Sequence, residues 1–486
     1  MKTTRKIGTK YALWGLVFIG TGLRFFHLGS QSLNWDELDT IMMTGKSYVG
    51  IIQELFGRLS RWGHPPLYYL VAKAGTVLGG TSEFALRFPS MLFSTLSILA
   101  MYFLGKELFN KKVGLFSAVF VTFSVHLVSY AQYAKPYALF WFLVTFQFLF
   151  FLRSLKFTSR LNFVFYVLST LFCVYTLYTG FVLILVQAIY VMIACPRRFK
   201  WFGWAMGIVA LLYLPWGFVL YKTATLHEAI LWMPKTDNYF LFFVMVFQYL
   251  TGVFFGNNVP FEWAGFLVVL CLGVFYTPKE MGQISVERMN KSDLLLYLWI
   301  FVPIILYILV DAFITPVLTV RYVGFLYIPF YILLGKGISC CGNKASIIIL
   351  CVFVGISLTQ HIFPYYERNL TPGGHDTRGV LIKIKSEAPL ALVVSKMPLS
   401  FYTQKVGLDF VKMRQLPEVK KKYDKIFIVY QCCDNLDSLS KAGEVPPDVP
   451  GFLKRASKIF GKNFKLTKDY KEPGIGFLEF DVVSVH

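Results

Sequence analysis

Long apolar runs recur along the chain from Tyr11 to Phe363, and short polar segments rich in Lys and Arg separate them. Runs such as ALFWFLVTFQFLFFL (138–152) are continuously apolar, which is typical of membrane helices and not of the alternating strands of a barrel. The pattern therefore predicts an all-α polytopic membrane protein. Eleven helices fit between the polar segments, near residues 11–28, 87–104, 113–130, 138–152, 162–178, 180–195, 201–220, 260–276, 294–312, 321–334 and 346–362.

Two further apolar segments, residues 65–80 and 238–256, are ambiguous because each is apolar enough to span. If 65–80 crossed the membrane, the basic segment KELFNKK (106–112) would move to the outer side, which basic loops avoid. An interfacial or re-entrant helix is the simpler interpretation, and the same argument applies to 238–256. The expected number of transmembrane helices is therefore about 11, rising to about 13 if both segments span.

Basic loops fix the expected topology, since cytoplasmic loops of membrane proteins carry an excess of Lys and Arg. With these loops and the N-terminal tail in the cytoplasm, an odd number of helices puts the C-terminal tail outside. We expect a multi-pass protein of the cell (inner or plasma) membrane. The loops are KELFNKK (106–112), RSLKFTSR (153–160), PRRFK (196–200), PKEMGQISVERMNK (278–291) and GKGISCCGNK (335–344).

Residues 363–486 differ from the rest, because they are polar and Lys-rich and contain short strand-like runs, LALVVS, KIFIVYQ and GIGFLEFDVV. Helix-like stretches lie between these runs. The pattern predicts a transmembrane domain over 1–362 and a small extracytoplasmic α/β domain over 363–486. Packing beside the membrane domain and acceptor binding are both open roles for it. The first outer loop, about 29–86, belongs to the transmembrane domain in this interpretation.

The net charge of +21 would suggest a nucleic-acid partner in a soluble protein. Here 56% of the residues are hydrophobic and only 15% are charged, and the basic residues gather in loops. Orientation in a lipid bilayer explains this charge, so no nucleic-acid partner is expected. The sequence contains no P-loop, GxGxxG or HExxH motif, and its eight cysteines form no CxxC pair.

The stretch SLNWDELDT (32–40) holds three carboxylates, Asp36, Glu37 and Asp39. A solvated turn or a helix N-terminus would explain it without a function, because Asp favours both. Residues 36 and 37 point in different directions on any regular backbone, so we expect them to do different jobs. Asp36 and Asp39 could share one face of a helical turn and grip a divalent cation, although two such ligands are a weak metal signal. No cofactor is assigned.

Other candidates are cations beside aromatic residues. His64 in GHPPLYY (63–69) precedes two prolines, which hold it out of a helix. It either belongs to a turn or points at a phosphate or an acceptor. Lys135 in SYAQYAKPYAL (129–139) lies among tyrosines that include Tyr137. An interfacial anchoring belt and a phosphate site are both open there.

Ionisable residues also occur near the outer ends of late helices. Asp311 ends one predicted span and Arg321 begins the next, in DAFITPVLTVRY (311–322). Ionisable groups at membrane depth are costly and indicate function, although a structural ion pair between these two residues is the alternative. Arg suits phosphate because its planar fork binds two oxygens. Arg24 and Arg87 lie near outer boundaries as well, where a long side chain can snorkel.

Taken in order, six motifs resemble those of the C-type glycosyltransferase superfamily, above all the branch of protein O-mannosyltransferases and lipid A aminoarabinose transferases. No single motif is specific, but six in this order over about residues 15–365 are a strong signal. In the fourth motif Tyr133 and Lys135 stand where relatives usually carry Glu and Arg. Lys135 keeps the positive charge of the Arg but lacks its two-pronged guanidinium, and the carboxylate of the Glu is lost. The motifs are WDE (35–37), HPP (64–66), RFPS (87–90), QYAKPYA (132–138), LPW (214–216) and RY (321–322).

The resemblance implies the fold of that superfamily and an integral membrane glycosyltransferase. Such an enzyme transfers a sugar, with inversion, from a polyprenyl-phosphate-linked donor to an acceptor hydroxyl at the outer face. Asp36 matches the catalytic base, and Glu37 matches the neighbour that helps to position the loop or the acceptor. The implied ligands of the donor phosphate are Lys135 and Arg321, then Arg87 and His64. Further candidate site residues, with no assigned role, are Asp39, Tyr137, Asp311 and Tyr322.

The sugar and the acceptor stay open: hexoses such as mannose, pentoses and modified sugars on the one hand, and a glycan, lipid or protein on the other. Two other function classes also stay open. A transporter or flippase for lipid-linked sugars would need phosphate-binding cations but no poised carboxylate, and inverted repeats would be expected. A non-catalytic assembly subunit with the same fold is the other class, and the altered fourth motif gives it some weight.

Overall fold

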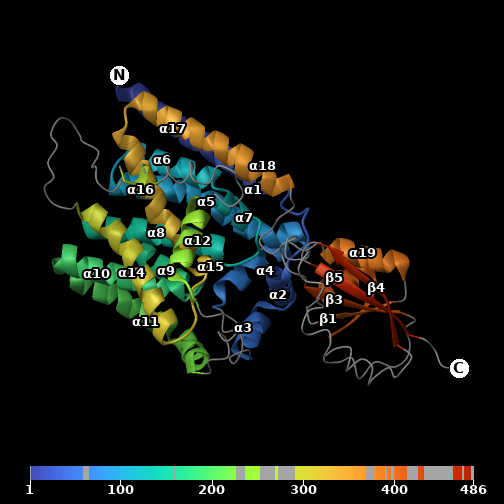
Figure 1. Ribbon diagram of the computed structural model, residues 1–486. Coiled ribbons are helices and arrows are strands. Elements are labelled where there is room, and N and C mark those ends of the chain that lie inside the picture. Colours follow the sequence, from blue (N-terminus) through green and yellow to red (C-terminus); the bar gives the residue numbers. More distant parts are fainter. Residues whose placement is uncertain are drawn as a thin grey trace. The chain divides into compact units, whose positions relative to one another are not determined.

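Figure 1 shows the computed structural model of the chain. It divides into two compact units, which we call the helical unit and the sheet unit. The helical unit comprises Met1–Phe26, Ser47–Ala74 and Arg87–Arg368, and the sheet unit comprises His27–Lys46, Gly75–Leu86 and Asn369–His486. The structure describes residues 2–57, 65–157, 159–225, 236–251, 267, 269–271, 290–367, 377–388, 391–395, 399–412, 425–431, 464–472 and 475–482.

The helical unit is built from the apolar runs of the sequence. Polar residues start several of its helices: Asn110 caps α6, Ser159 caps α9 and Asn290 caps α14, each by accepting a backbone N–H. Short 3-10 turns cover Pro196–Arg198 and Gly324–Leu326, and a π turn covers Ser357–Ile362. The end of α4 and the first residues of α5 belong to the sheet unit. The α-helices that lie wholly or mostly in the helical unit are α1 (Lys2–Phe25), α3 (Tyr48–Gly57), α4 (Leu67–Gly79), α5 (Glu83–Leu108), α6 (Lys111–Phe123), α7 (Val125–Ala131), α8 (Tyr137–Lys156), α9 (Arg160–Val174), α10 (Thr179–Ala194), α11 (Phe199–Thr225), α12 (Tyr239–Thr251), α14 (Lys291–Phe313), α15 (Val320–Val323), α16 (Tyr327–Cys340), α17 (Asn343–Ile356) and α18 (Phe363–Glu367).

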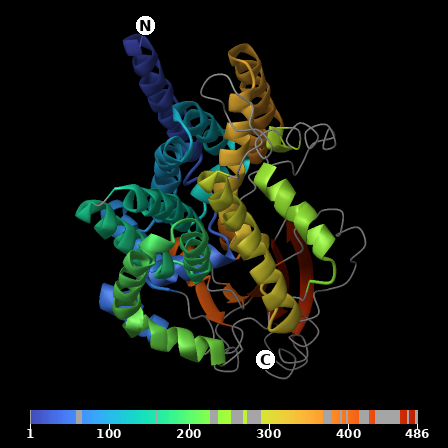
Figure 2. The same cartoon turned by 90° about the vertical axis from the view of Figure 1, so that its left-hand side faces the viewer.

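Helix α6 is buried along most of its length and packs against α1 and α16. Small residues permit this close approach. A Cβ added at Gly114 would collide with the backbone of α5, and one at Gly335 of α16 would collide with Ser117 of α6. Such small residues are typical of membrane helices that pack backbone to backbone. Helices α1, in dark blue, and α17, in orange, overlap in Figure 1, and the turned view in Figure 2 shows them apart.

Six of the described helices are long and apolar enough to cross a membrane, which confirms the predicted polytopic helical fold. They are Glu83–Leu108, Tyr137–Lys156, Pro196–Tyr221, Lys291–Phe313, Val320–Cys340 and Asn343–Tyr366. The predicted helix 113–130 is instead two helices, α6 and α7, that meet at Ser124 with a bend of 61°. Counted as one broken span, this pair makes a seventh.

Shorter apolar helices account for other predicted spans. Helices α9 and α10 have 15 and 16 residues. The ambiguous segment 65–80 forms α4, of 13 residues, which is shorter than the run of about 20 that a membrane helix needs. The described part of the segment 238–256 forms α12, also of 13 residues. The predicted helix 260–276 lies almost entirely outside the described residues, and the total of eleven spans stays a prediction.

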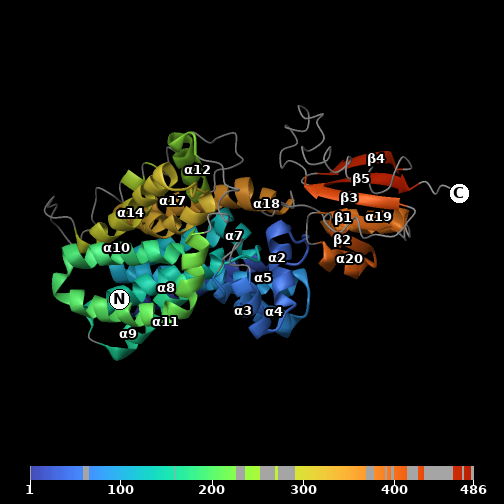
Figure 3. The same ribbon diagram turned by 90° about the horizontal axis from the view of Figure 1, so that it is seen from below.

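The sheet unit contains a five-stranded sheet with the order β2-β1-β3-β5-β4, which Figure 3 shows from below. Strands β1 and β2 are parallel because α20 (Ser400–Val406) crosses over between them, whereas β4 and β5 form an antiparallel hairpin. Gly407 ends α20 in the left-handed region, at φ 73°. The strands are β1 (Leu392–Ser395), β2 (Asp409–Lys412), β3 (Lys425–Gln431), β4 (Phe464–Glu472) and β5 (Ile475–Val482).

The three predicted strand-like runs correspond to β1, β3 and β5. The sheet unit is larger than the domain expected over 363–486, because two segments of the predicted first loop belong to it. One of them carries α2 (Trp35–Thr44), which packs against α20. The acidic cluster therefore lies in the sheet unit, together with residues more than three hundred positions later in the chain.

Candidate active site

The acidic cluster forms the first turns of α2. Asn34 is the N-cap residue: its side-chain oxygen accepts the backbone N–H of Glu37 at 3.0 Å. In return, Oε2 of Glu37 accepts the backbone N–H of Asn34 at 3.1 Å. This reciprocal pair is a capping box, which satisfies two of the helix's orphan donors. A helix N-terminus, which was one of the interpretations of this stretch, is therefore present. Its N-cap residue is Asn34 and not an aspartate.

The three carboxylates face different surroundings, as the sequence predicted for residues 36 and 37. Glu37 is fully buried, whereas Asp36 and Asp39 are half-buried. The buried face of α2 includes Leu38 and Ile41. Asp36 occupies the first turn of the helix, where the positive end of the helix dipole stabilises a carboxylate. Among the described residues, no group of three or more His, Cys, Asp or Glu could hold a metal ion.

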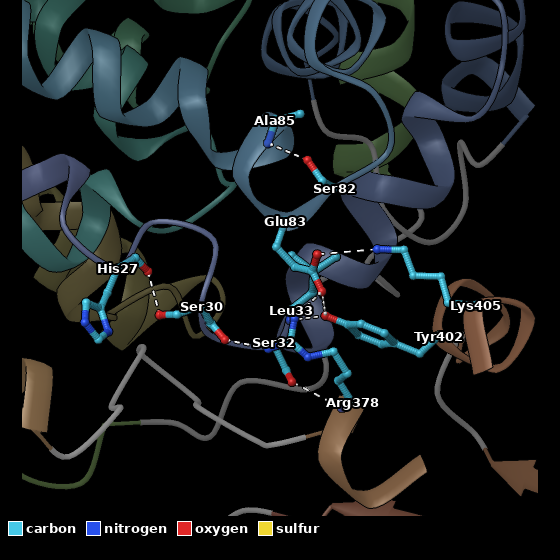
Figure 4. A network of polar contacts seen from close by, with 10 residues as sticks. All are labelled: His27, Ser30, Ser32, Leu33, Ser82, Glu83, Ala85, Arg378, Tyr402 and Lys405. Atoms are coloured by element: carbon cyan, nitrogen blue, oxygen red, sulfur yellow. Dashed lines mark hydrogen bonds and ion pairs between the residues drawn. The ribbon is translucent and has the colours of Figure 1, made fainter. Parts of the chain in front are cut away.

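Glu83, in the first turn of α5, joins a polar network inside the sheet unit (Figure 4). Its Oε1 accepts the Tyr402 hydroxyl at 3.1 Å and lies 3.3 Å from Nη1 of Arg378. Its Oε2 lies 3.4 Å from Nζ of Lys405. The Glu83 side chain is only 7% exposed, against 38% and 41% for the two cations. Sequence reasoning missed these four residues, because nothing in the local pattern marks partners so far apart in the chain.

In the helical unit, the fourth motif follows α7 directly. Lys135 is half-buried in the short connection between α7 and α8. The ring of Tyr130 meets those of Tyr133 and Tyr137 edge to face, at centroid distances of 5.6 and 5.2 Å, and the latter two rings stack at 6.2 Å. Gln132 is buried, and its side chain binds the backbone of Arg24 and the Tyr365 hydroxyl. The motif therefore combines a structural glutamine with a cation beside an aromatic cluster.

Asp311 is buried near the end of α14 and holds the connection that leads to Arg321. Its Oδ1 accepts the backbone N–H groups of Val317 and Leu318 at 2.9 and 3.1 Å. Arg321 lies in the short helix α15, and both it and Tyr322 are half-buried. Asp311 thus acts on the backbone before the RY motif, a role that the sequence did not indicate.

Residues beside the second and fifth motifs take part in a chain of contacts in the helical unit, which includes one residue of the third motif. The Tyr68 hydroxyl, just after HPP, lies 3.1 Å from Oγ of Ser90 in RFPS. The backbone of Leu67 donates to the carbonyl of Tyr175 at 3.0 Å, and the Tyr175 hydroxyl donates to the carbonyl of Leu212 beside LPW. Arg87 is fully buried and does not snorkel. His64 lies outside the described residues.

Arg24 is also fully buried. It binds carbonyls near the bend between α6 and α7, donating to Val121 at 2.7 Å and to Thr122 at 3.3 Å. Its Nε donates to Oγ of Ser94 at 2.8 Å. The last carbonyls of a helix have no intrahelical partners, so this guanidinium satisfies groups that the break at Ser124 leaves unpaired. The interpretation of Arg24 as a snorkelling residue is therefore wrong.

Comparison with known protein families finds a match to one part of the chain. Residues 63–218 match the family model described as dolichyl-phosphate-mannose-protein mannosyltransferase, a span that holds the second to fifth motifs. No curated protein matches the chain in sequence.

Solved structures share the fold. ArnT from Cupriavidus metallidurans, in its apo state, is 13% identical with a TM-score of 0.59, over 96% of this chain and 97% of that one. The same protein bound to undecaprenyl phosphate is 12% identical with a TM-score of 0.59, again over 96% of this chain and 97% of that one. The oligosaccharyltransferase of Archaeoglobus fulgidus, tethered to an acceptor peptide, is 10% identical with a TM-score of 0.54, over 100% of this chain and 75% of that one.

Proposed function

We propose that this chain is a C-type glycosyltransferase, and that it transfers a sugar from a polyprenyl-phosphate-linked donor to an acceptor hydroxyl; its fold and motifs support this. The transfer inverts the anomeric centre and takes place at the outer face of the cell membrane, with the N-terminus in the cytoplasm. The basic loops, which favour the cytoplasmic side, support this orientation.

The donor class rests on the relatives. The matching family model is named for dolichyl-phosphate-mannose, and ArnT was solved with undecaprenyl phosphate bound. Dolichyl and undecaprenyl phosphates share a long isoprenoid chain and a phosphate head. We therefore propose a polyprenyl phosphate as the leaving group and mannose as the first sugar to test, with a glycan, lipid or protein as the acceptor class.

The observation that carries the proposal is the separation of Asp36 from Glu37 on α2. Asp36 is half-buried in a first helical turn, while Glu37 turns inward to cap the helix. An inverting displacement needs one base. As the acceptor oxygen bonds to the anomeric carbon and the bond from that carbon to the phosphate oxygen breaks, the acceptor proton passes to Asp36. Glu37 positions this turn through the capping box.

Charge that develops on the departing phosphate needs cationic partners. We assign this role to Lys135 and Arg321, with Arg87 and His64 in support. Lys135 supplies a compact ammonium charge. Arg321 supplies a planar guanidinium that can bind two phosphate oxygens at once, which Lys135 in the fourth motif cannot do. Asp311 fixes the backbone before Arg321. The tyrosines beside the two cations, Tyr137 and Tyr322, are candidate hydroxyl donors to the same phosphate.

The test is a turnover assay on the full-length protein in lipid. Radiolabelled polyprenyl-phosphate sugars, mannose first, are offered with a crude membrane extract as the acceptor, and the parent is compared with Asp36→Asn. A general base contributes about 10²–10⁴-fold, so a loss of this size is expected.

Asp39→Asn is the matched control, because it removes a similar half-buried charge from the same helix. We expect it to cost much less. A folded Asp36→Asn variant with the parental rate would exclude Asp36 as the base. Donor binding without transfer from any donor would favour the transporter or the assembly subunit.

A further inference from the structure

The segment that leads into α2 is held by residues from the far end of the chain, within the sheet unit (Figure 4). The Leu33 backbone N–H donates to the Tyr402 hydroxyl at 2.6 Å. Arg378 donates through Nη2 to the carbonyl of Ser30 at 2.6 Å. The backbone N–H of Arg378 donates to Oγ of Ser32 at 3.1 Å. Three of the four residues from Ser30 to Leu33 are therefore bound directly.

These contacts come immediately before the capping box. Asn34 follows Leu33 and caps α2, and Asp36 lies in the first turn of that helix. The segment is bound through the backbone of Ser30 and Leu33 and the side chain of Ser32, and it is capped at Asn34. This leaves few free dihedral angles between the network and the Asp36 side chain. The orientation of the carboxylate therefore follows the position of this segment.

Tyr402 has the best geometry for setting that position. It is fully buried in α20, and its hydroxyl both accepts from Leu33 and donates to Glu83. The Glu83 carboxylate also faces Arg378 and Lys405, so the same acid links both cations of the network. Removing the Tyr402 oxygen would take a partner from a buried N–H and from a buried carboxylate at once.

We infer that Tyr402 is a positioning residue for the transfer reaction, and that with Arg378 and Glu83 it sets the place of Asp36. This gives the C-terminal part of the chain a role in catalysis that needs no contact with the substrate. The inference rests on the proposed function, in which Asp36 is the base. A misplacement of about 1 Å can cost about 10²-fold in rate, so the network does not have to touch the reacting atoms to control turnover.

The experiment compares the full-length parent with Tyr402→Phe in lipid nanodiscs. Hydrogen exchange is measured over residues 30–44, and kcat and donor KM are measured with the polyprenyl-phosphate sugar that the parent uses. We expect faster exchange in Tyr402→Phe and a kcat lower by about 10- to 100-fold, with donor KM nearly unchanged. A variant that was merely less stable would not separate kcat from KM in this way.

Thr403→Val is the matched control. Thr403 is the buried neighbour in α20, and its hydroxyl bonds back to Leu399 and Ser400 near the start of the same helix. This variant perturbs α20 without touching the segment before α2, so exchange over 30–44 and kcat should match the parent. Arg378→Lys is the second test variant if Tyr402→Phe does not fold. It keeps the charge but loses the fork that reaches both Glu83 and Ser30.

Each outcome decides the question. Parental exchange over 30–44, or faster exchange with parental kcat, would overturn the positioning role. Equal losses in Thr403→Val would assign the effect to α20 in general and overturn it too. If the parent itself transfers no sugar, the proposed function fails, whereas the exchange rates still show whether Tyr402 holds the segment.

Discussion

Asn34 and Glu37 cap one end of α2 reciprocally, each accepting the other's backbone N–H at 3.0 and 3.1 Å. The acidic residue beside the proposed base therefore has a structural use. A glutamine can make the same contact, because a capping box accepts either Glu or Gln at this position. The two adjacent carboxylates therefore have different roles: Glu37 caps the helix, and Asp36 is the proposed base.

Because of these two hydrogen bonds, we expect two substitutions at Glu37 to have different effects. Glu37→Gln should keep the capping box and most of the activity. Glu37→Ala should lose about 1–3 kcal/mol of stability and reduce turnover, because the buried N–H of Asn34 loses this partner and the first turn of α2 loosens. Hydrogen exchange over α2 and the rate of sugar transfer measure the two effects. An inactive Glu37→Gln variant with an ordered α2 would instead show that the Glu37 charge takes part in the chemistry.

Arg321→Ala should weaken donor binding as well as turnover. A hydrogen bond to a charged group contributes about 1.5–3 kcal/mol, so we expect the donor Kd to rise about 10-fold or more. Equilibrium binding of a radiolabelled polyprenyl-phosphate sugar measures this. Arg153→Ala is the control, because Arg153 lies in a predicted cytoplasmic loop and pairs with Glu107 at 3.6 Å. Unchanged donor affinity in Arg321→Ala would remove Arg321 from the phosphate site.

Arg24→Met should damage the fold rather than the chemistry. The guanidinium binds the carbonyls of Val121 and Thr122 and the hydroxyl of Ser94, all buried, and the variant would leave these groups without that partner. We expect a lower yield of folded protein and a lower unfolding temperature, with donor KM unchanged in the folded fraction. Ser94→Ala removes one contact and should have a smaller effect. A stable Arg24→Met variant with weak donor binding would point to the lipid phosphate instead.

Lys336 and Asp293 form a buried ion pair between α16 and α14, with Nζ and Oδ1 2.6 Å apart. Breaking a buried pair by removing one partner costs about 3–5 kcal/mol, because the other charge is left uncompensated. Lys336→Met and Asp293→Leu should each lower the unfolding temperature strongly. The double variant should recover most of the loss, and thermal unfolding in detergent measures all three. Additive losses in the double variant would show that the two charges do not depend on each other.

Patterns within a few residues could be predicted from the sequence alone. Continuous apolar runs predict membrane helices, because backbone groups in lipid must find partners within the same segment. The strand-like runs that became β1, β3 and β5 were visible because short stretches rich in β-branched and aromatic residues stand out in a polar, Lys-rich region. The different directions of Asp36 and Glu37 follow from helix geometry, and the order of the six motifs predicted a fold that solved structures share.

Only the tertiary structure decided which distant residues act together. Glu83 and Tyr402 are 319 positions apart, and no local pattern links them. The same is true of Arg24, whose carbonyl partners lie 97 and 98 residues later at a helix break that the apolar pattern does not show. Periodicity records which face of a helix is buried, but it does not record which segment covers that face. For this reason the sequence identified the acidic turn of α2, and the folded chain identified the residues that hold it.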